Sequence, residues 1–224
     1  MRIQAVTLDI GGTLIEPWPS VGHVYAEVAA AHGLKTFSAE QLNARFKTAW
    51  RARNQFGYSR SDWQSLVEEV FGGADLLTPG LFGDLYNRFT HPEVWRIYDD
   101  VLPALNALAS REIKLAVISN WDERLRGLLS ALKLDRYFAT CAISIEVGFT
   151  KPSPVIFQQA AGKLGLPANS ILHVGDSPEM DFAGATAAGF QARLIQRRPI
   201  NTQNATLPSL GGLIAIIEQS HRED

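Results

Sequence analysis

The stretch from which the fold can be inferred is IQAVTLDIGGT, residues 3–13. Residues 3–10 are mostly apolar and include β-branched side chains, which is typical of a buried strand. The strand ends at two glycines, which break regular structure and allow a backbone to approach a ligand closely. From about residue 17 to 91 the sequence then shows helical periodicity and no convincing strand. These patterns predict a strand followed by a helical segment.

Beyond residue 95, segments with strand and helix patterns alternate along the chain. Such alternation implies a parallel sheet covered by helices on both faces. We therefore expect an α/β core made of residues 1–15 and 95–224, and a helical insert, the cap, made of residues 16–94. The predicted strands of the second part are 114–118, 140–145, 170–174 and 191–195, and 199–209 is predicted to be a loop.

Composition narrows the class of protein. Of the 224 residues, 46% are hydrophobic and 20% are charged, as in globular chains, which excludes a disordered protein. The formal charge of −2 provides no basic field that would attract nucleic acid, so we expect no nucleic-acid partner. The single cysteine, Cys141, excludes an intramolecular disulfide and a cysteine-rich zinc site.

No targeting signal is visible in the sequence. The N-terminal apolar stretch is short and is interrupted by Asp9 and two glycines, unlike a signal peptide. No uncharged apolar run approaches the roughly 20 residues that span a bilayer. We therefore expect a cytoplasmic protein with no membrane partner, and the sequence leaves the oligomeric state open.

Polar residues follow four predicted strands, at the edge where open parallel sheets bind ligands. Two carboxylates that converge from different strands make a hard oxygen site suited to Mg²⁺. A lysine, a hydroxyl and glycine N–H groups beside them suit a phosphate, and a carboxylate can act as a nucleophile. Singly, each residue has a commoner structural explanation, so the inference depends on their order along the chain. In that order they are Asp9, Gly11, Gly12 and Thr13; Ser119 and Asn120; Lys151; and Asp176 with Asp181.

These ordered motifs resemble those of the haloacid dehalogenase (HAD) superfamily of hydrolases. The resemblance spans nearly the whole chain and includes a helical cap between the first and second motifs, the C1 position. It implies a Rossmann-like parallel sheet core with an inserted α-helical cap. Residues 91–95, 115–120 and 173–176 further resemble the branch called haloacid dehalogenase-like hydrolase domain-containing protein 3. The main motifs are DIGGTL (9–14), ISN (118–120), KP (151–152) and GDSPEMD (175–181).

The resemblance also implies roles for individual residues. Asp9 would be the nucleophile that forms an aspartyl-phosphate, and Lys151 would neutralise the phosphate and orient Asp9. Mg²⁺ would be held by Asp9, Asp176 and the backbone carbonyl of Gly11. Asp181 would be the fourth metal-site residue, acting through water or by holding Lys151. The implied function is Mg²⁺-dependent hydrolysis of a small phosphorylated metabolite. The implied phosphate-binding positions are Gly12, Thr13, Ser119, Asn120 and Lys151.

Gly11 departs from the family pattern, because most phosphatases of the family carry a second Asp at that position. That Asp protonates the leaving group, and such a group typically contributes about 10²–10⁴-fold in rate. We favour a phosphatase in which water or a cap residue replaces the acid, with a preference for aryl phosphates, acyl phosphates or phosphoanhydrides over simple alkyl phosphates. The alternatives are a weakly active or inactive protein that binds a phosphorylated ligand or a protein partner, and a phosphonatase or dehalogenase.

Three further residues are candidates for substrate contact. Trp18 lies close to the first motif in sequence, and Trp121 directly follows Asn120. His23 is one of the nearest titratable residues that could replace the missing acid. Each also has a structural interpretation: a hinge contact for Trp18, a packing role for Trp121 and a surface helix position for His23.

Overall fold

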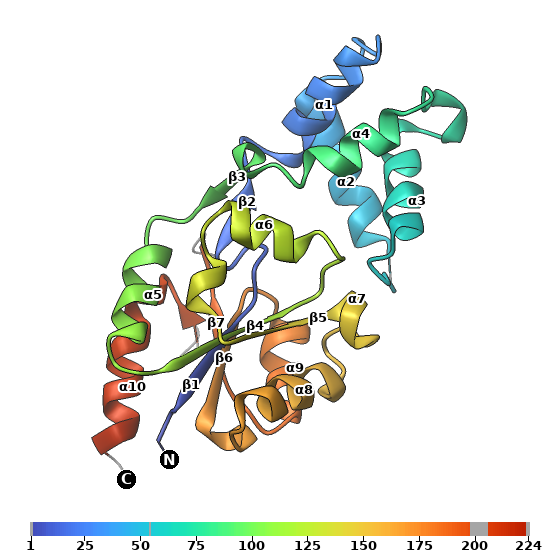
Figure 1. The fold of residues 1–224 in the computed structure, drawn as a ribbon. Coiled ribbons are helices and arrows are strands. Elements are labelled where there is room, and N and C mark those ends of the chain that lie inside the picture. The colour runs from blue at the N-terminus through green and yellow to red at the C-terminus, as the bar shows by residue number, and fades with distance from the viewer. Residues whose placement is uncertain (1, 54, 198–205, 223–224) are drawn as a thin grey trace. The chain divides into compact units, whose positions relative to one another are not determined.

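A computed structural model describes residues 2–53, 55–197 and 206–222 (Figure 1). The chain forms two compact units, which we call the core unit and the helical unit. The core unit comprises Met1–Ile15, Ile97–Glu123 and Lys133–Asp224. The helical unit comprises Glu16–Arg96 and Arg124–Leu132.

A six-stranded parallel sheet forms the centre of the core unit, as the alternating pattern predicts (Figure 1). Its order is β5-β4-β1-β6-β7-β8. Leu8 of β1 is level with Val117 of β4 and Val174 of β6, so the polar residues that follow these three strands emerge side by side. The strands are β1 (Ala5–Leu8), β4 (Lys114–Ser119), β5 (Thr140–Ile143), β6 (Ile171–Gly175), β7 (Gln191–Ile195) and β8 (Thr206–Leu207).

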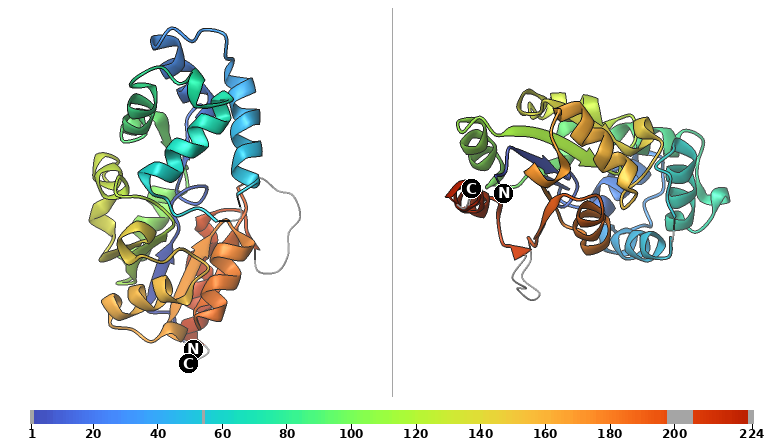
Figure 2. Two further views of the ribbon diagram at one scale, coloured as in Figure 1. Left: turned by 90° about the vertical axis from the view of Figure 1, so that its right-hand side faces the viewer. Right: turned by 90° about the horizontal axis from the view of Figure 1, so that it is seen from below.

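Helices cover both faces of this sheet, and the central strands β1, β4 and β6 are accordingly buried on both sides. Helices α5 (Val101–Ala109) and α10 (Leu213–Arg222) pack together on one face, and α8 (Pro154–Leu164) and α9 (Gly184–Ala187) pack on the other (Figures 1 and 2). On the second face, Phe157 of α8 is fully buried. The remaining short elements are α7 (Ser144–Val147), the 3-10 turns η3 (Asp135–Tyr137), η4 (Ala168–Ser170) and η6 (Leu210–Gly212), and the π-helical turn η5 (Pro178–Ala183).

Most of the loop predicted at 199–209 lies outside the described residues. Within the part that the structure describes, residues 206–207 form the edge strand β8 and 210–212 form η6. Among the described residues, no helix is both long and apolar enough to span a bilayer.

The helical unit is built around an aromatic core. Ser38 and Ser59 are the N-caps of two of its helices, and each forms a capping box with the residue three positions on. Tyr25 packs against Phe46, Phe71 and other rings at centroid distances of 6.0 Å. The helices are α1 (Val21–Ala31), α2 (Ala39–Arg51), α3 (Arg60–Phe71), α4 (Leu81–Arg88) and α6 (Leu125–Ala131), with 3-10 turns η1 (Ala74–Leu76) and η2 (Pro92–Val94).

Helix α6 belongs to the helical unit, whereas its position in the sequence predicts a place in the core. Arg124, just before α6, explains the difference. Its guanidinium donates to the carbonyl of Tyr86 at 2.6 Å and lies 3.5 Å from the centroid of the Tyr86 ring. The chain passes between the units at 15–16, 96–97, 123–124 and 132–133. Around the first two of these points, β2 (Ile15–Pro17) and β3 (Trp95–Ile97) pair as a two-stranded sheet.

Candidate active site

The carboxylate of Asp9 is held by donors from three directions. Asp9 follows β1 and is buried. Its Oδ1 accepts from Ser119 Oγ at 2.9 Å and from Lys151 Nζ at 2.7 Å. Its Oδ2 accepts from Thr13 Oγ1 at 3.3 Å. The orientation of this carboxylate is therefore set by the protein before any ligand binds.

Lys151 is buried and pairs with two carboxylates. Its ammonium donates to Asp9 and, at 2.5 Å, to Asp181 Oδ1. Burial alone would lower the pKa of Lys151, but the two carboxylates outweigh it and raise the pKa well above its ordinary value. Burial would likewise raise the pKa of Asp181, yet Lys151 and a hydrogen bond with His173 hold it well below the ordinary range. Both groups are therefore charged at neutral pH.

Asp181 is fixed by contacts at both of its oxygens. Besides Lys151, Oδ1 is 3.0 Å from His173 Nε2, and Oδ2 accepts from the backbone N–H of Ser177 at 2.9 Å. The opposite ring nitrogen of His173 is 2.9 Å from Thr7 Oγ1. A chain of polar contacts thus runs from Thr7 through His173, Asp181 and Lys151 to Asp9. This favours Asp181 as a support for Lys151, and its predicted part as a metal ligand stays a prediction.

His173 is not among the site residues expected from the sequence. It is fully buried on β6 and packs edge-on against Phe157, with ring centroids 5.3 Å apart. Its polar role has a weak sequence signal: a histidine inside an otherwise apolar strand needs hydrogen-bond partners. The partners cannot be identified without the neighbouring strand β1 and the turn η5.

Asn120 fixes the backbone at Lys151. Its Oδ1 accepts from the backbone N–H of Lys151 at 2.7 Å, and its Nδ2 donates to the carbonyl of Lys151 at 3.0 Å. This pair of bonds joins the end of β4 to the segment that carries the lysine. The Asn120 side chain therefore positions Lys151, and the predicted contact of the Asn120 backbone N–H with phosphate stays a prediction.

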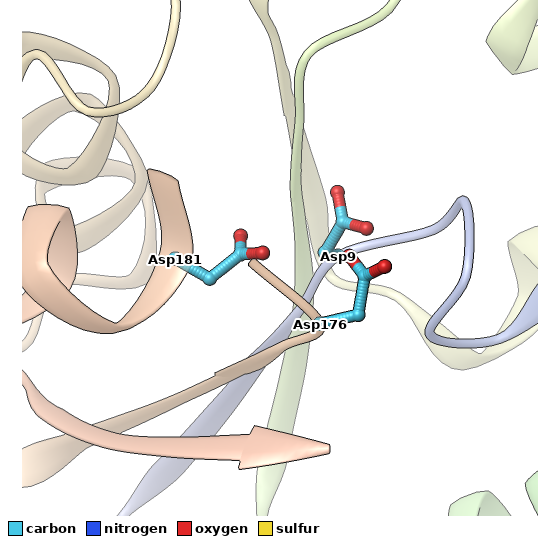
Figure 3. Close-up of side chains that lie close together, drawn as sticks. All are labelled: Asp9, Asp176 and Asp181. Carbon is cyan, nitrogen blue, oxygen red and sulfur yellow. The ribbon is translucent and has the colours of Figure 1, made fainter. Parts of the chain in front are cut away.

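Asp9, Asp176 and Asp181 form a cluster of three carboxylates (Figure 3). One oxygen of each lies within 4.8 Å of the others. Partial desolvation, together with the charges of Asp9 and Asp181, raises the pKa of Asp176 to about 7. A divalent cation would relieve this repulsion, and carboxylate oxygens are the ligands that Mg²⁺ prefers. The donor set therefore fits Mg²⁺, with Asp9 and Asp176 as the residues best placed to hold it.

The backbone at Gly12 is shaped for a close approach to Asp176. Gly12 has φ of 76°, and a β-carbon there would lie 2.4 Å from Asp176 Oδ2. Its N–H donates to the carbonyl of Ile15 at 2.8 Å. The prediction that this N–H binds phosphate is therefore untested, and would require the N–H to exchange its partner.

Comparison with known proteins identifies the family. A model of the haloacid dehalogenase-like hydrolases matches residues 3–189. The chain belongs to this family. It is 30% identical over 219 residues to the haloacid dehalogenase-like hydrolase domain-containing protein 3 of Danio rerio, with 92% of this chain and 90% of the relative covered.

Solved structures of HAD proteins have the same fold. A HAD phosphatase from Thermococcus onnurineus is 25% identical, with a TM-score of 0.72 over 96% of this chain and 98% of that one. The Bacillus subtilis protein YfnB, described as a HAD hydrolase and bound to magnesium, has a TM-score of 0.75 at 17% identity over 97% of this chain and 99% of that one. The HAD-like α/β fold expected from the motifs is therefore confirmed.

In this HAD-like hydrolase, Trp121 lies directly against Gly11. A β-carbon at Gly11 would be 3.3 Å from Trp121 Cζ3. The backbone of Trp121 is held by Ser144, whose Oγ accepts from the Trp121 N–H and donates to its carbonyl, each at 3.0 Å. The structure therefore brings Trp121 next to the first motif. This proximity is necessary for the predicted contact with substrate, which stays a prediction.

Trp18 and His23 belong to the helical unit of the hydrolase, and the contacts described for them there are local. The Arg96 guanidinium lies 4.0 Å from the centroid of the Trp18 ring, and Arg96 also pairs with Glu16. His23 Nδ1 is 2.7 Å from the Oγ of Ser20, the residue that caps α1. These contacts support the structural interpretations of both residues, and their contact with substrate stays a prediction.

Proposed function

We propose that this HAD-like hydrolase is a Mg²⁺-dependent phosphohydrolase that acts on a small phosphorylated metabolite through an aspartyl-phosphate. One observation carries the proposal: the buried Asp9 carboxylate is oriented by Ser119 and Lys151 and lies beside Asp176. A carboxylate held in this way is suited to nucleophilic attack, and the second carboxylate is suited to hold a cation.

In the first step, a carboxylate oxygen of Asp9 forms a bond to phosphorus, and the bond from phosphorus to the leaving-group oxygen breaks. The leaving group departs with the electron pair of that bond. In the second step, water attacks the phosphorus of the aspartyl-phosphate, which restores Asp9 and releases inorganic phosphate. Bound Mg²⁺ supplies positive charge that offsets the repulsion between a carboxylate and a phosphate dianion.

The residues around Asp9 have separate tasks in this scheme. Lys151 adds a fixed positive charge next to the attacking carboxylate, where charge develops on the transferred phosphoryl group. Ser119 holds Asp9 Oδ1 and would donate to a phosphoryl oxygen once the substrate is bound. Asp181 and His173 keep the lysine in place. Such preorganised charge is useful because it needs no rearrangement during the reaction.

Position 11 offers no side chain that could protonate the leaving group. Esters whose leaving groups are stable as anions lose least from this absence, because protonation contributes little to their departure. We therefore expect aryl phosphates, acyl phosphates or phosphoanhydrides to be better substrates than simple alkyl phosphates.

The deciding experiment is hydrolysis of para-nitrophenyl phosphate by the wild type and by Asp9→Asn, with Mg²⁺ and with a chelator. Asp135→Asn, a change at an exposed carboxylate of the same unit, is the matched control. Turnover that needs both Mg²⁺ and Asp9, and that Asp135→Asn retains, would support the proposal. Absence of Asp9-dependent turnover in folded protein would overturn it in favour of a binding role.

A further inference from the structure

A side chain at Gly11 is disfavoured by lack of space and not by backbone conformation. Its φ is not among the positive values that the structure records for other glycines, so an L-residue could adopt the same backbone. A β-carbon there would nevertheless lie 3.3 Å from Trp121 Cζ3, inside the roughly 3.5–4.0 Å of an optimal carbon–carbon contact. Among the described residues beyond the chain neighbours of Gly11, Trp121 is the one within 4 Å of that position.

Trp121 is not free to move its backbone away from Gly11. Its N–H and carbonyl are both bonded to Ser144 Oγ at 3.0 Å, and the N–H of Ile145 donates to the same carbonyl at 3.2 Å. Ser144 is itself buried. On the other side, Asn120 is bonded to the backbone of Lys151. The backbone that carries the indole is therefore tied to the same segments that position the lysine.

We infer that Trp121 is a specificity-determining residue, because its indole occupies the space that a proton-donating side chain at position 11 needs. The inference rests on the proposed phosphohydrolase function and deepens it. An Asp introduced at position 11 would have to share this space with the ring, so the acid is excluded by a neighbour as well as absent from the sequence. The substrate class is phosphate esters and anhydrides with leaving groups that depart as stable anions, aryl phosphates among them.

The claim that the indole limits the space at position 11 is tested without any substrate, by a double-mutant cycle that measures unfolding. Gly11→Ala should lower the urea midpoint of the wild type but have a clearly smaller effect in the Trp121→Leu background. Gly162→Ala is the matched control, since a β-carbon at Gly162 meets nothing within 4 Å and should not lower the midpoint in either background. Equal effects of Gly11→Ala in the two backgrounds would show that the indole does not limit position 11, and would overturn the inference.

The specificity part is tested by comparing kcat/KM for para-nitrophenyl phosphate and glycerol 2-phosphate, in the presence of Mg²⁺. We expect the ratio of the two values to be about 10²-fold or more in the wild type, and Gly11→Asp alone to leave it high. Gly11→Asp combined with Trp121→Leu should lower the ratio about tenfold or more, because the acid then has room. A ratio that falls as far with Gly11→Asp alone would overturn the inference.

Failure of the two proposals can be told apart. If no phosphate ester is hydrolysed in an Asp9-dependent way, the proposed function is overturned, and the leaving-group preference with it. If Asp9-dependent hydrolysis is present but the cycle on Gly11 and Trp121 shows no coupling, the function stands and the role of Trp121 is overturned.

Discussion

Lys151 Nζ lies 2.5 Å from Asp181 Oδ1, and both side chains are buried. Lys151 also pairs with Asp9, so replacing it with Met leaves two buried carboxylates without their cation. Removing one partner of a buried ion pair typically costs about 3–5 kcal/mol, because the remaining charge is uncompensated. We expect Lys151→Met to lower the free energy of unfolding by about this amount and to abolish Asp9-dependent hydrolysis.

Urea unfolding and turnover of para-nitrophenyl phosphate measure both effects of Lys151→Met. Lys163→Met is the matched control, because Lys163 is exposed on α8 and should change neither quantity appreciably. A variant as stable as the wild type would contradict the charge balance inferred for Lys151, Asp9 and Asp181.

His173 should act as a positioning residue through Asp181. Replacing it with Ala removes the contact to Asp181 Oδ1 and leaves Thr7 without its partner. Residues that orient the groups around a metal site typically contribute about 10–100-fold to affinity or activity. We expect His173→Ala to lower kcat by a factor in this range while Asp9-dependent turnover remains detectable.

A matched packing variant, Phe157→Leu, distinguishes positioning by His173 from loss of packing. Phe157→Leu removes the ring that contacts His173 edge-on but leaves the polar chain intact. This control should reduce stability through the cavity it creates and change kcat much less than His173→Ala does. If Phe157→Leu and His173→Ala lose the same stability and also lose kcat to a similar extent, His173 serves packing alone.

The sheet and its polar edge could be predicted from sequence because the signals are local. A short apolar run followed by Asp9 and two glycines marks the end of β1, and similar patterns mark β4 and β6. The carboxyl ends of parallel strands share one edge of the sheet, so the sequence predicts that Asp9 and Asp176 lie at the same edge. Their direct proximity comes from the strand order, in which β1 and β6 are neighbours although β4 and β5 lie between them in the chain.

Features that depend on contacts distant in sequence could not be predicted. The pairing of β2 with β3 joins segments about 80 residues apart, and each is too short to show a period of two. The membership of α6 in the helical unit depends on the contact between Arg124 and Tyr86. The fit of Trp121 against Gly11 likewise needs a structure, because the sequence shows only that Trp121 follows the second motif.

Asp176 should make the stability of the metal-free protein depend on pH. Its pKa is raised from 3.8 to about 7 by desolvation and the neighbouring carboxylates, so the folded protein holds this proton more tightly than the unfolded chain does. Stability therefore falls as pH rises from about 4 to 7. Asp176 is exposed, so solvent screens its interactions with the neighbouring charges. We therefore expect the free energy of unfolding to change by only about 1 kcal/mol over this pH range.

Urea unfolding between pH 5 and 8 in chelator measures this slope for the wild type and for Asp176→Asn. The Asn variant should be the more stable of the two at pH 8 and should lack this part of the slope, whereas Asp135→Asn should retain it. Mg²⁺ favours the ionised carboxylate, so it should stabilise the wild type more at pH 8 than at pH 5 and should have little effect on Asp176→Asn. An unchanged slope in Asp176→Asn would rule out this group as its source.

Gly12→Ala separates the cost of backbone conformation from the cost of crowding Asp176. Gly148 provides the matched control, since its φ of 78° is close to the 76° of Gly12 but a β-carbon there meets nothing within 4 Å. Gly148→Ala should cost about 1 kcal/mol, the usual penalty of a left-handed L-residue. Gly12→Ala should cost about 1–3 kcal/mol more, because its methyl would lie 2.4 Å from Asp176 Oδ2. Gly12→Ala should also weaken the stabilisation by Mg²⁺, whereas Gly148→Ala should retain it. Equal losses of unfolding free energy in the two variants would show that Asp176 moves aside freely for a side chain at position 12.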